Sequence, residues 1–299
     1  YHRVAVGSTR MEPWHVWVLI GGLGWAWLIA LAEGYRRSVI REDDFAANAL
    51  SLVVRAYARV VHRVRVEGRE HVPVADAQGR IDHPLIVAAN HTAGVDPLLI
   101  QAVIGFEPRW MMAEDMRVAA LEPLWELARI IFVDRANRDS RSAREALRHL
   151  KGGGVLGVFP EGHIERPPEH LLPFRGGVGF LIARSRAPVL PVVISGTPQV
   201  DPAWAALTRR SRSLLRFLPV VRYGPEMSPE EISADLERRF AEATGWPRAP
   251  RTPILTRGGA VYVDLQGRYV DASGVVLTDA EARAFAEGAS GGASKEETA

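Results

Sequence analysis

The sequence predicts an α/β fold preceded by two helices at a membrane, and three observations predict it. Between residues 60 and 245, short runs of branched apolar residues alternate with helix-like segments, the pattern of an α/β layer fold. Residues 14–32 carry no formal charge. The chain has 299 residues, of which 47% are hydrophobic, so it can bury a large core.

Charge and cysteine content exclude several classes of function. The net charge is only +2, which argues against a protein that binds nucleic acid through bulk charge. The absence of cysteine excludes disulfides, thiolate nucleophiles and Cys-ligated zinc. The nine histidines include no H-E-x-x-H spacing, so we expect no metal and no bound cofactor.

The first two elements are predicted to be membrane-associated helices. As a helix, residues 14–32 are about 28 Å long, close to the ~30 Å hydrocarbon core of a bilayer. Tryptophans suited to an interface lie at Trp14, Trp17 and Trp25. In the next segment, apolar residues recur at helical spacing with arginines between them, which predicts an amphipathic surface helix.

We expect the remainder of the chain on the cytoplasmic face, because Arg36, Arg37 and Arg41 directly follow the apolar segment. The anchor is either monotopic or single-pass. Two alternatives remain open. The first helix could instead be buried in a core, or it could be a signal peptide in which Ala30 to Ala32 resembles a cleavage site.

The central part is predicted to contain seven strands and five helices in alternation. The strands are expected at 64–66, 85–89, 110–113, 130–133, 155–159, 189–194 and 218–223. The helices are expected at 97–104, 115–127, 140–151, 176–185 and 229–243. An additional amphipathic helix is predicted at 207–218, with leucines on one face and arginines elsewhere, either packed on the core or lying on an anionic bilayer.

The chain changes character after Trp246. Residues 247–253 read as a linker, and Gly267 marks the turn of a small hairpin. Thr278 and Glu281 have the spacing of a capping box before a short helix, and residues 290–299 are predicted to be disordered. The predicted parts are therefore an anchor at 1–59, a central domain at 60–245 and an accessory segment at 246–299.

The stretch "NHTAGVD" carries the first candidate site. Asp96 followed by Pro97 predicts a helix start with the aspartate as N-cap. His91 directly follows a buried strand, so the pair lies on a strand-to-helix loop, where ligands gather in α/β folds. The carboxylate can accept a hydrogen bond from the imidazole and leave the other ring nitrogen free as a base. A capping aspartate near an unrelated loop histidine is the alternative.

Further segments follow in a fixed order: "FVDR" ending at Arg135, "FPEG" at 159–162, "LLPFRGG" with Arg175, and "LPVVISG" ending at Gly196. Together with "NHTAGVD", they resemble the sequence blocks of the glycerolipid and lysophospholipid acyltransferase family. The resemblance covers about residues 60–245 and implies a mixed sheet flanked by helices.

This resemblance implies transfer of an acyl group from acyl-CoA or acyl carrier protein to a hydroxyl, or an amine, of a membrane lipid. His91 would be the general base and Asp96 would orient it, without an acyl-enzyme intermediate. The residues expected at the substrate are Asn90, Arg135, Glu161, Gly162 and Arg175, with Arg135 on an acceptor phosphate. The sequence does not predict an oligomeric state.

The match departs from the family at two cations. Ile164 stands where the third block carries arginine, and Glu114 stands where a lysine is common. Arg166 is a candidate to replace the arginine in space. These changes predict an acceptor other than lysophosphatidate, either a lysophospholipid with a larger headgroup or a non-phosphate lipid.

Two rival functions remain. A catalytically silent relative could bind acyl lipid or scaffold a membrane complex. A lipid hydrolase would use the base on water, although no G-x-S-x-G motif is present.

Overall fold

A seven-stranded sheet is the centre of the computed structural model, which describes residues 13–36, 38–41, 44–134, 140–256 and 259–291. The strand order is β1-β7-β6-β2-β5-β3-β4. All neighbours are parallel except β6 and β7, so the sheet is mixed, as predicted. The strands are β1 Arg65–Glu67, β2 Leu85–Ala89, β3 Pro108–Ala113, β4 Ile131–Val133, β5 Val155–Val158, β6 Val189–Ser195 and β7 Leu214–Phe217.

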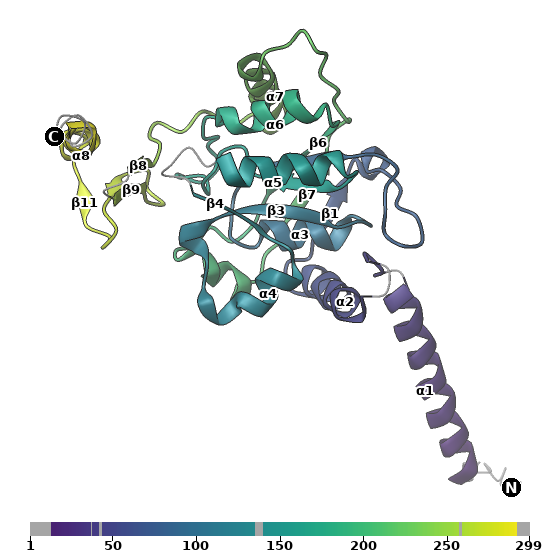
Figure 1. Ribbon diagram of the computed structural model, residues 1–299. Helices are drawn as coiled ribbons and strands as arrows, with labels where there is room; N and C mark the ends of the chain where they lie inside the picture. Colours follow the sequence, from purple (N-terminus) through teal and green to yellow (C-terminus); the bar gives the residue numbers. More distant parts are fainter. Residues whose placement is uncertain (1–12, 37, 42–43, 135–139, 257–258, 292–299) are drawn as a thin grey trace, which may run out of the picture.

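Helices cover both faces of this sheet (Figure 1). Alternate side chains of β2 point to opposite faces, so Val87 packs in one core cluster and Ile86 in the other. The first cluster lies under α2 and α3, and the second lies under α5, α6 and α7. The helix bounds are α2 Phe45–Val60, α3 Asp96–Val103, α4 Glu122–Leu127, α5 Ser140–Lys151, α6 Gly176–Ser185 and α7 Pro229–Thr244.

The predictions around the last strand were wrong. Residues 207–218 do not form an amphipathic helix, because Leu214–Phe217 is strand β7 and lies between β1 and β6. Leu215 and Phe217 are fully buried, whereas Arg216 faces outward and pairs with Glu67 at 2.7 Å. The strand predicted at 218–223 is therefore loop, apart from one bridge at Val221.

The helix predicted at 115–127 is broken into short pieces. Two 3₁₀ turns, Glu114–Met116 and Ala119–Leu121, precede α4. Pro123 lies in the first turn of α4, where its missing N–H costs no hydrogen bond, but it cannot continue a helix from upstream.

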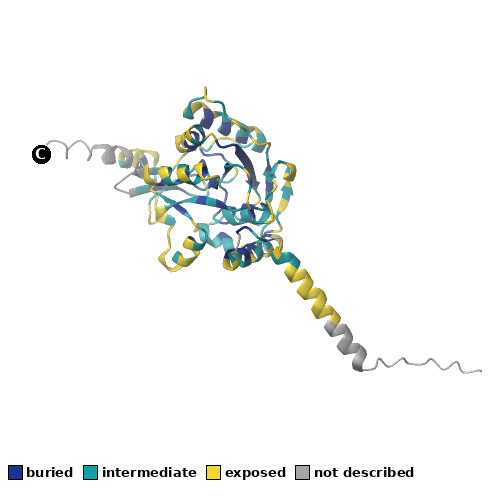
Figure 2. Cartoon of the chain, turned by 45° about the vertical axis from the view of Figure 1, so that its right-hand side comes forward, coloured by how far each residue is buried: buried dark blue, intermediate teal, exposed yellow. Residues whose placement is uncertain are grey.

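Two N-terminal helices are present where the sequence predicts them, α1 at Pro13–Arg36 and α2. Figure 2 shows α1 extending away from the sheet, with most of its coloured residues exposed. Trp25 is 69% exposed and Ile29 is 64% exposed, so the buried-core alternative was wrong. No helix in the described ranges combines the length and the apolarity needed to cross a membrane, so a spanning segment at 14–32 is not supported.

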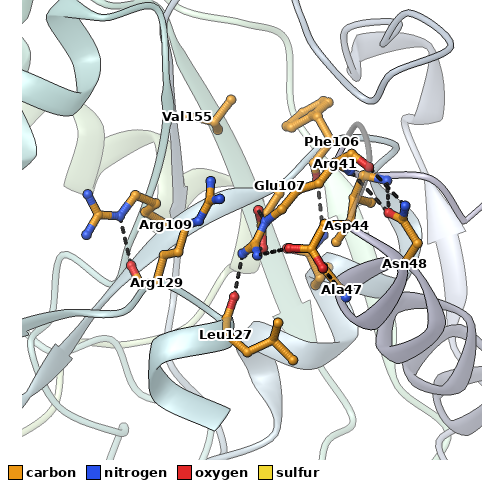
Figure 3. Close-up of polar contacts among 12 residues, drawn as sticks. Arg41, Asp44, Ala47, Asn48, Phe106, Glu107, Arg109, Leu127, Arg129 and Val155 are labelled. Carbon is orange, nitrogen blue, oxygen red and sulfur yellow. Dashed lines mark hydrogen bonds and ion pairs between the residues drawn. The ribbon is translucent and has the colours of Figure 1, made fainter. Parts of the chain in front are cut away.

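The corner between α1 and α2 is tied to the sheet by Arg41 (Figure 3). Its side chain is only 8% exposed and pairs with Asp44 at 2.8 Å and with both carboxylate oxygens of Glu107. It also donates to the carbonyl of Leu127 at the end of α4. The amide of Asn48 closes the corner by bonding the Arg41 backbone.

The C-terminal segment forms a small antiparallel sheet of four strands, β8 Ile254–Thr256, β9 Gly259–Val263, β10 Tyr269–Val270 and β11 Val276–Leu277. The predicted hairpin is confirmed, with Gly267 at its turn. The capping box of Thr278 and Glu281 is confirmed at the start of α8, Asp279–Gly291. Most of the tail predicted to be disordered, residues 292–299, lies outside the described residues.

Candidate active site

Three of the predicted segments meet at one edge of the sheet. Strand β2 lies between β5 and β6 and is parallel to both, so the carboxyl ends of all three strands face the same way. The loops after β2, β5 and β6 begin with Asn90, Phe159 and Gly196, respectively. This is the edge at which open α/β sheets place their ligands.

His91 and Asp96 lie on the first of these loops and are bonded to each other. Nδ1 of His91 is 2.9 Å from Oδ2 of Asp96. The same oxygen accepts the backbone N–H of Thr92 at 2.6 Å and of Ala93 at 2.8 Å, so it is an acceptor and Nδ1 is the donor. This fixes the tautomer and leaves Nε2 of the imidazole unprotonated and able to accept a proton.

Asp96 makes these contacts as the first residue of helix α3, one position after the N-cap position predicted for it. Helix α3 begins at Asp96, Val95 is its N-cap, and no side chain caps it. The carboxylate therefore does not cap the helix but turns back onto its own loop, where it is fully buried. Oδ1 accepts the Thr92 hydroxyl at 3.1 Å, and that hydroxyl lies 2.6 Å from the hydroxyl of Thr197 after β6.

Asn90 connects the same loop to β6. Its side chain donates to the carbonyl of Ile194 at 3.0 Å and accepts the N–H of Ile194 at 2.7 Å. The residue is fully buried, so in this structure its carboxamide supports the loop that carries His91.

Glu161, in the "FPEG" segment, connects the loop of His91 to the "LLPFRGG" segment. Oε1 of its carboxyl accepts the backbone N–H of His91 at 2.8 Å, and Oε2 accepts the N–H of Leu172 at 2.8 Å. Burial raises the pKa of Glu161 well above its ordinary value, and the two amide hydrogen bonds oppose that rise. The backbone of Glu165 adds a contact, donating to the carbonyl of His91 at 2.7 Å.

A small cavity of about 220 Å³ lies beside Glu161. Gly162 has φ of +70°, and a Cβ there would come within 2.6 Å of Nε of Arg175, so the Arg175 side chain packs over the glycine. Thr252 and Pro253 of the C-terminal segment form another wall of the cavity. The backbone bridge between Leu171 and Arg248 holds that segment against the "LLPFRGG" segment. The full lining is Glu161, His163, Leu172, Pro173, Phe174, Arg175, Thr252 and Pro253.

Two of the expected cations need separate mention. Arg135 lies outside the described residues, so its predicted place at the substrate stays a prediction. Arg166 does not replace the missing block arginine, because its buried guanidinium bonds Asp201 at 2.8 Å and the carbonyl of Glu165 at 2.7 Å.

Sequence reasoning missed two residues near the site, Phe159 and Glu165. The ring of Phe159 stacks on the imidazole of His91 with centroids 4.0 Å apart. The carboxyl of Glu165 is fully buried, and desolvation raises its pKa to about 8. "FPEG" marks Phe159 as part of a motif, but only the structure gives its orientation. In the described part of the chain, no three His, Asp or Glu side chains are grouped to hold a metal.

Comparisons with known proteins show which proteins this chain is similar to. Residues 63–195 match a family model described as Acyltransferase. A 1-acyl-sn-glycerol-3-phosphate acyltransferase of Limnanthes douglasii is 25% identical over 228 residues, 73% of this chain and 73% of that protein. A protein of the same name from Saccharomyces cerevisiae is 27% identical over 179 residues, 57% of this chain and 56% of its own length.

A solved structure shares the fold. It is the crystal structure of the 1-acyl-sn-glycerophosphate (LPA) acyltransferase PlsC from Thermotoga maritima, with a TM-score of 0.54 and 22% sequence identity. The match covers 74% of this chain and 88% of that one. The mixed sheet and its flanking helices are therefore an arrangement already known for one acyltransferase.

Proposed function

We propose that this chain, which matches the Acyltransferase family model over residues 63–195, moves a fatty acyl group from a thioester to the hydroxyl of a lysophospholipid, with His91 as the general base. Nε2 of His91 takes the hydroxyl proton while the hydroxyl oxygen attacks the thioester carbonyl carbon. The C–S bond then breaks, and the proton passes to the leaving thiolate. Base catalysis of this kind contributes about 10²–10⁴-fold.

One observation carries the proposal: the hydrogen bond between Nδ1 of His91 and the buried carboxylate of Asp96. An imidazole held in this way presents its basic nitrogen to the edge of the sheet, and the nearby negative charge stabilises the imidazolium that forms during transfer. The alternative of a capping aspartate beside an unrelated histidine has no support in this geometry.

The thiol released from acyl-CoA or from acyl carrier protein, measured with and without a lysophospholipid, tests the reaction. Release that requires the acceptor supports a transferase. Release without acceptor would indicate a hydrolase, and no release with either donor would indicate a silent lipid-binding relative. The assay includes acyl chains of several lengths.

For the acceptor, we propose the lysophosphatidate class. The relatives bear the name 1-acyl-sn-glycerol-3-phosphate acyltransferase, which weighs against the expectation drawn from Ile164 and Glu114. Arg175, at the cavity beside Glu161, is the described cation best placed for a headgroup phosphate. Faster transfer to zwitterionic lysolipids or amino-lipids than to lysophosphatidate would restore the sequence-based expectation.

We also propose that the enzyme works at a membrane surface with α1 lying along it. Apolar side chains of α1 that are more than half exposed support this, namely Leu23, Trp25, Trp27, Leu28 and Ile29. Burying such side chains in a bilayer is favourable by roughly 25 cal/mol per Å² of apolar surface. Flotation of the protein with vesicles of anionic and of zwitterionic lipid measures this association.

A further inference from the structure

Three aromatic rings form a column that ends on the imidazole of His91. The His91 and Phe159 rings are 4.0 Å apart at their centroids, with an interplanar angle of 18°. Behind Phe159, the indole of Trp110 lies 5.2 Å away at an angle of 17°. Phe159 directly follows β5 and Trp110 belongs to β3, so two neighbouring strands hold the column.

Gly157 provides the space for this column. It is the partner of Trp110 in the register of β3 and β5. A Cβ at Gly157 would lie 2.4 Å from Cε3 of the indole, closer than real Cβ contacts allow. The indole therefore lies over the bare backbone of β5, where only a glycine admits it.

A hydrogen bond at one nitrogen does not fix an imidazole completely. The bond from Nδ1 to Asp96 sets one point of the ring but leaves rotation of the ring plane about that bond. Phe159 covers one face and removes that rotation. The His91 side chain remains 18% exposed in this arrangement.

The face of an aromatic ring also attracts a cation, because its quadrupole is negative there. In the proposed reaction, the base His91 is cationic while it holds the acceptor's proton. The interaction with Phe159 is therefore stronger in the transition state than in the ground state, which is the condition for accelerating a reaction.

We propose that Phe159 is a positioning residue of the transfer reaction, held in place by Trp110 over Gly157. It fixes the plane of His91 and stabilises the imidazolium that forms. This inference rests on the proposed function of His91 as a base, but the geometry of the stack can be tested separately.

The experiment compares Phe159→Leu, which keeps an apolar side chain of similar size, with Phe159→Tyr, which keeps the ring. We expect kcat to fall about 3- to 30-fold in the leucine variant, with KM for the acceptor unchanged, and to recover in the tyrosine variant. Gly157→Ala, which touches the indole and not the substrate, should lower kcat in the same direction. Phe180→Leu, at a 41% exposed phenylalanine on α6, is the matched control and should keep full activity.

NMR of the His91 ring protons gives a readout that does not depend on turnover. Protons that lie over an aromatic face are shifted upfield by its ring current, so we expect these resonances to move downfield in Phe159→Leu and to stay near their wild-type positions in Phe159→Tyr. Unmoved resonances, or wild-type kcat, in the leucine variant would overturn the inference. If the resonances move but the wild-type protein releases no thiol, the stack stands and the proposed function fails.

Discussion

Replacing Asp96 with asparagine tests the chemistry of the site directly. The carbonyl oxygen of an asparagine can occupy the place of Oδ2 and still accept from His91, Thr92 and Ala93. Its NH₂ group then faces the Thr92 hydroxyl, which can accept as well as donate. The substitution therefore keeps the hydrogen-bond pattern and removes only the charge.

The size of the effect follows from these contacts. Three hydrogen bonds to a carboxylate become bonds to a neutral amide, which costs about 1 kcal/mol each, or roughly 3 kcal/mol of unfolding free energy. The imidazolium loses its counter-charge at the moment it forms. We expect kcat to fall by about 10²–10⁴-fold, or ~2.7–5.5 kcal/mol of activation free energy, in Asp96→Asn and in His91→Ala alike.

The assay is acceptor-dependent thiol release by the two single variants and the double variant. Because Asp96 acts through His91, the double variant should be no slower than His91→Ala alone. Effects that multiply would refute the pairing, and so would an Asp96→Asn variant with more than a tenth of wild-type kcat. Asp82→Asn is the matched control, since Asp82 bonds His83 in an exposed pair before the other end of β2.

Three further outcomes test the fold, its pH response and the membrane surface. In urea unfolding, Arg41→Ala should lose about 3–5 kcal/mol of unfolding free energy, because the acidic partners of this buried guanidinium are left unpaired. Arg36→Ala, which removes an exposed ion pair, should leave the unfolding midpoint unchanged. Equal effects of the two substitutions would contradict the role of Arg41 at the corner between α1 and α2. Burial raises the pKa of Glu165 from 4.5 to about 8, so the folded chain keeps a proton that the unfolded chain releases, and stability should decline by up to ~1.4 kcal/mol per unit as the pH rises between these values. In thermal melts across that pH range, the stability of Glu165→Gln should depend less on pH than that of the wild-type protein. An unaltered slope of stability against pH would mean that another group causes the dependence. Trp25→Glu should reduce flotation with anionic vesicles several-fold, and Val74→Glu, at an even more exposed apolar residue of a loop, should not; the same loss in both would mean that α1 is not the contact.

Strands buried on both faces were predictable, because a short continuous run of apolar residues is typical of a strand that is covered on both sides. All five residues of β2 are fully buried, and its predicted bounds match the structure. The prediction for residues 214–217, in contrast, was wrong. Leu-Leu-Arg-Phe, with Leu207 upstream and Leu218 downstream, fits a helical period as well as an alternating one, and only pairing with the distant strand β1 decides between them.

The same contrast holds within the site. His91 and Asp96 are five residues apart, so a local loop is enough to explain why they meet, and their bond was predictable. The stack of Phe159 on His91 was not, because it depends on which face of β5 the Trp110 indole covers. Arg166 was misplaced for a related reason: its partner Asp201 lies on a different loop.

Glu161 shows why a motif residue can have a role other than the one its motif suggests. Its two carboxyl oxygens bond the backbone of His91 and of Leu172, so the side chain joins the loop of the base to a wall of the cavity. A substitution at Glu161 would displace His91 and the wall of the cavity beside Glu161 together. Losses in kcat and in acceptor binding at this position would therefore be expected even if no substrate atom touched the carboxyl. A direct contact between Glu161 and the substrate would have to use the carboxyl lone pairs that do not accept from the two backbone amides. Geometry therefore separates a substrate-binding role of Glu161 from its role in supporting the loop of His91.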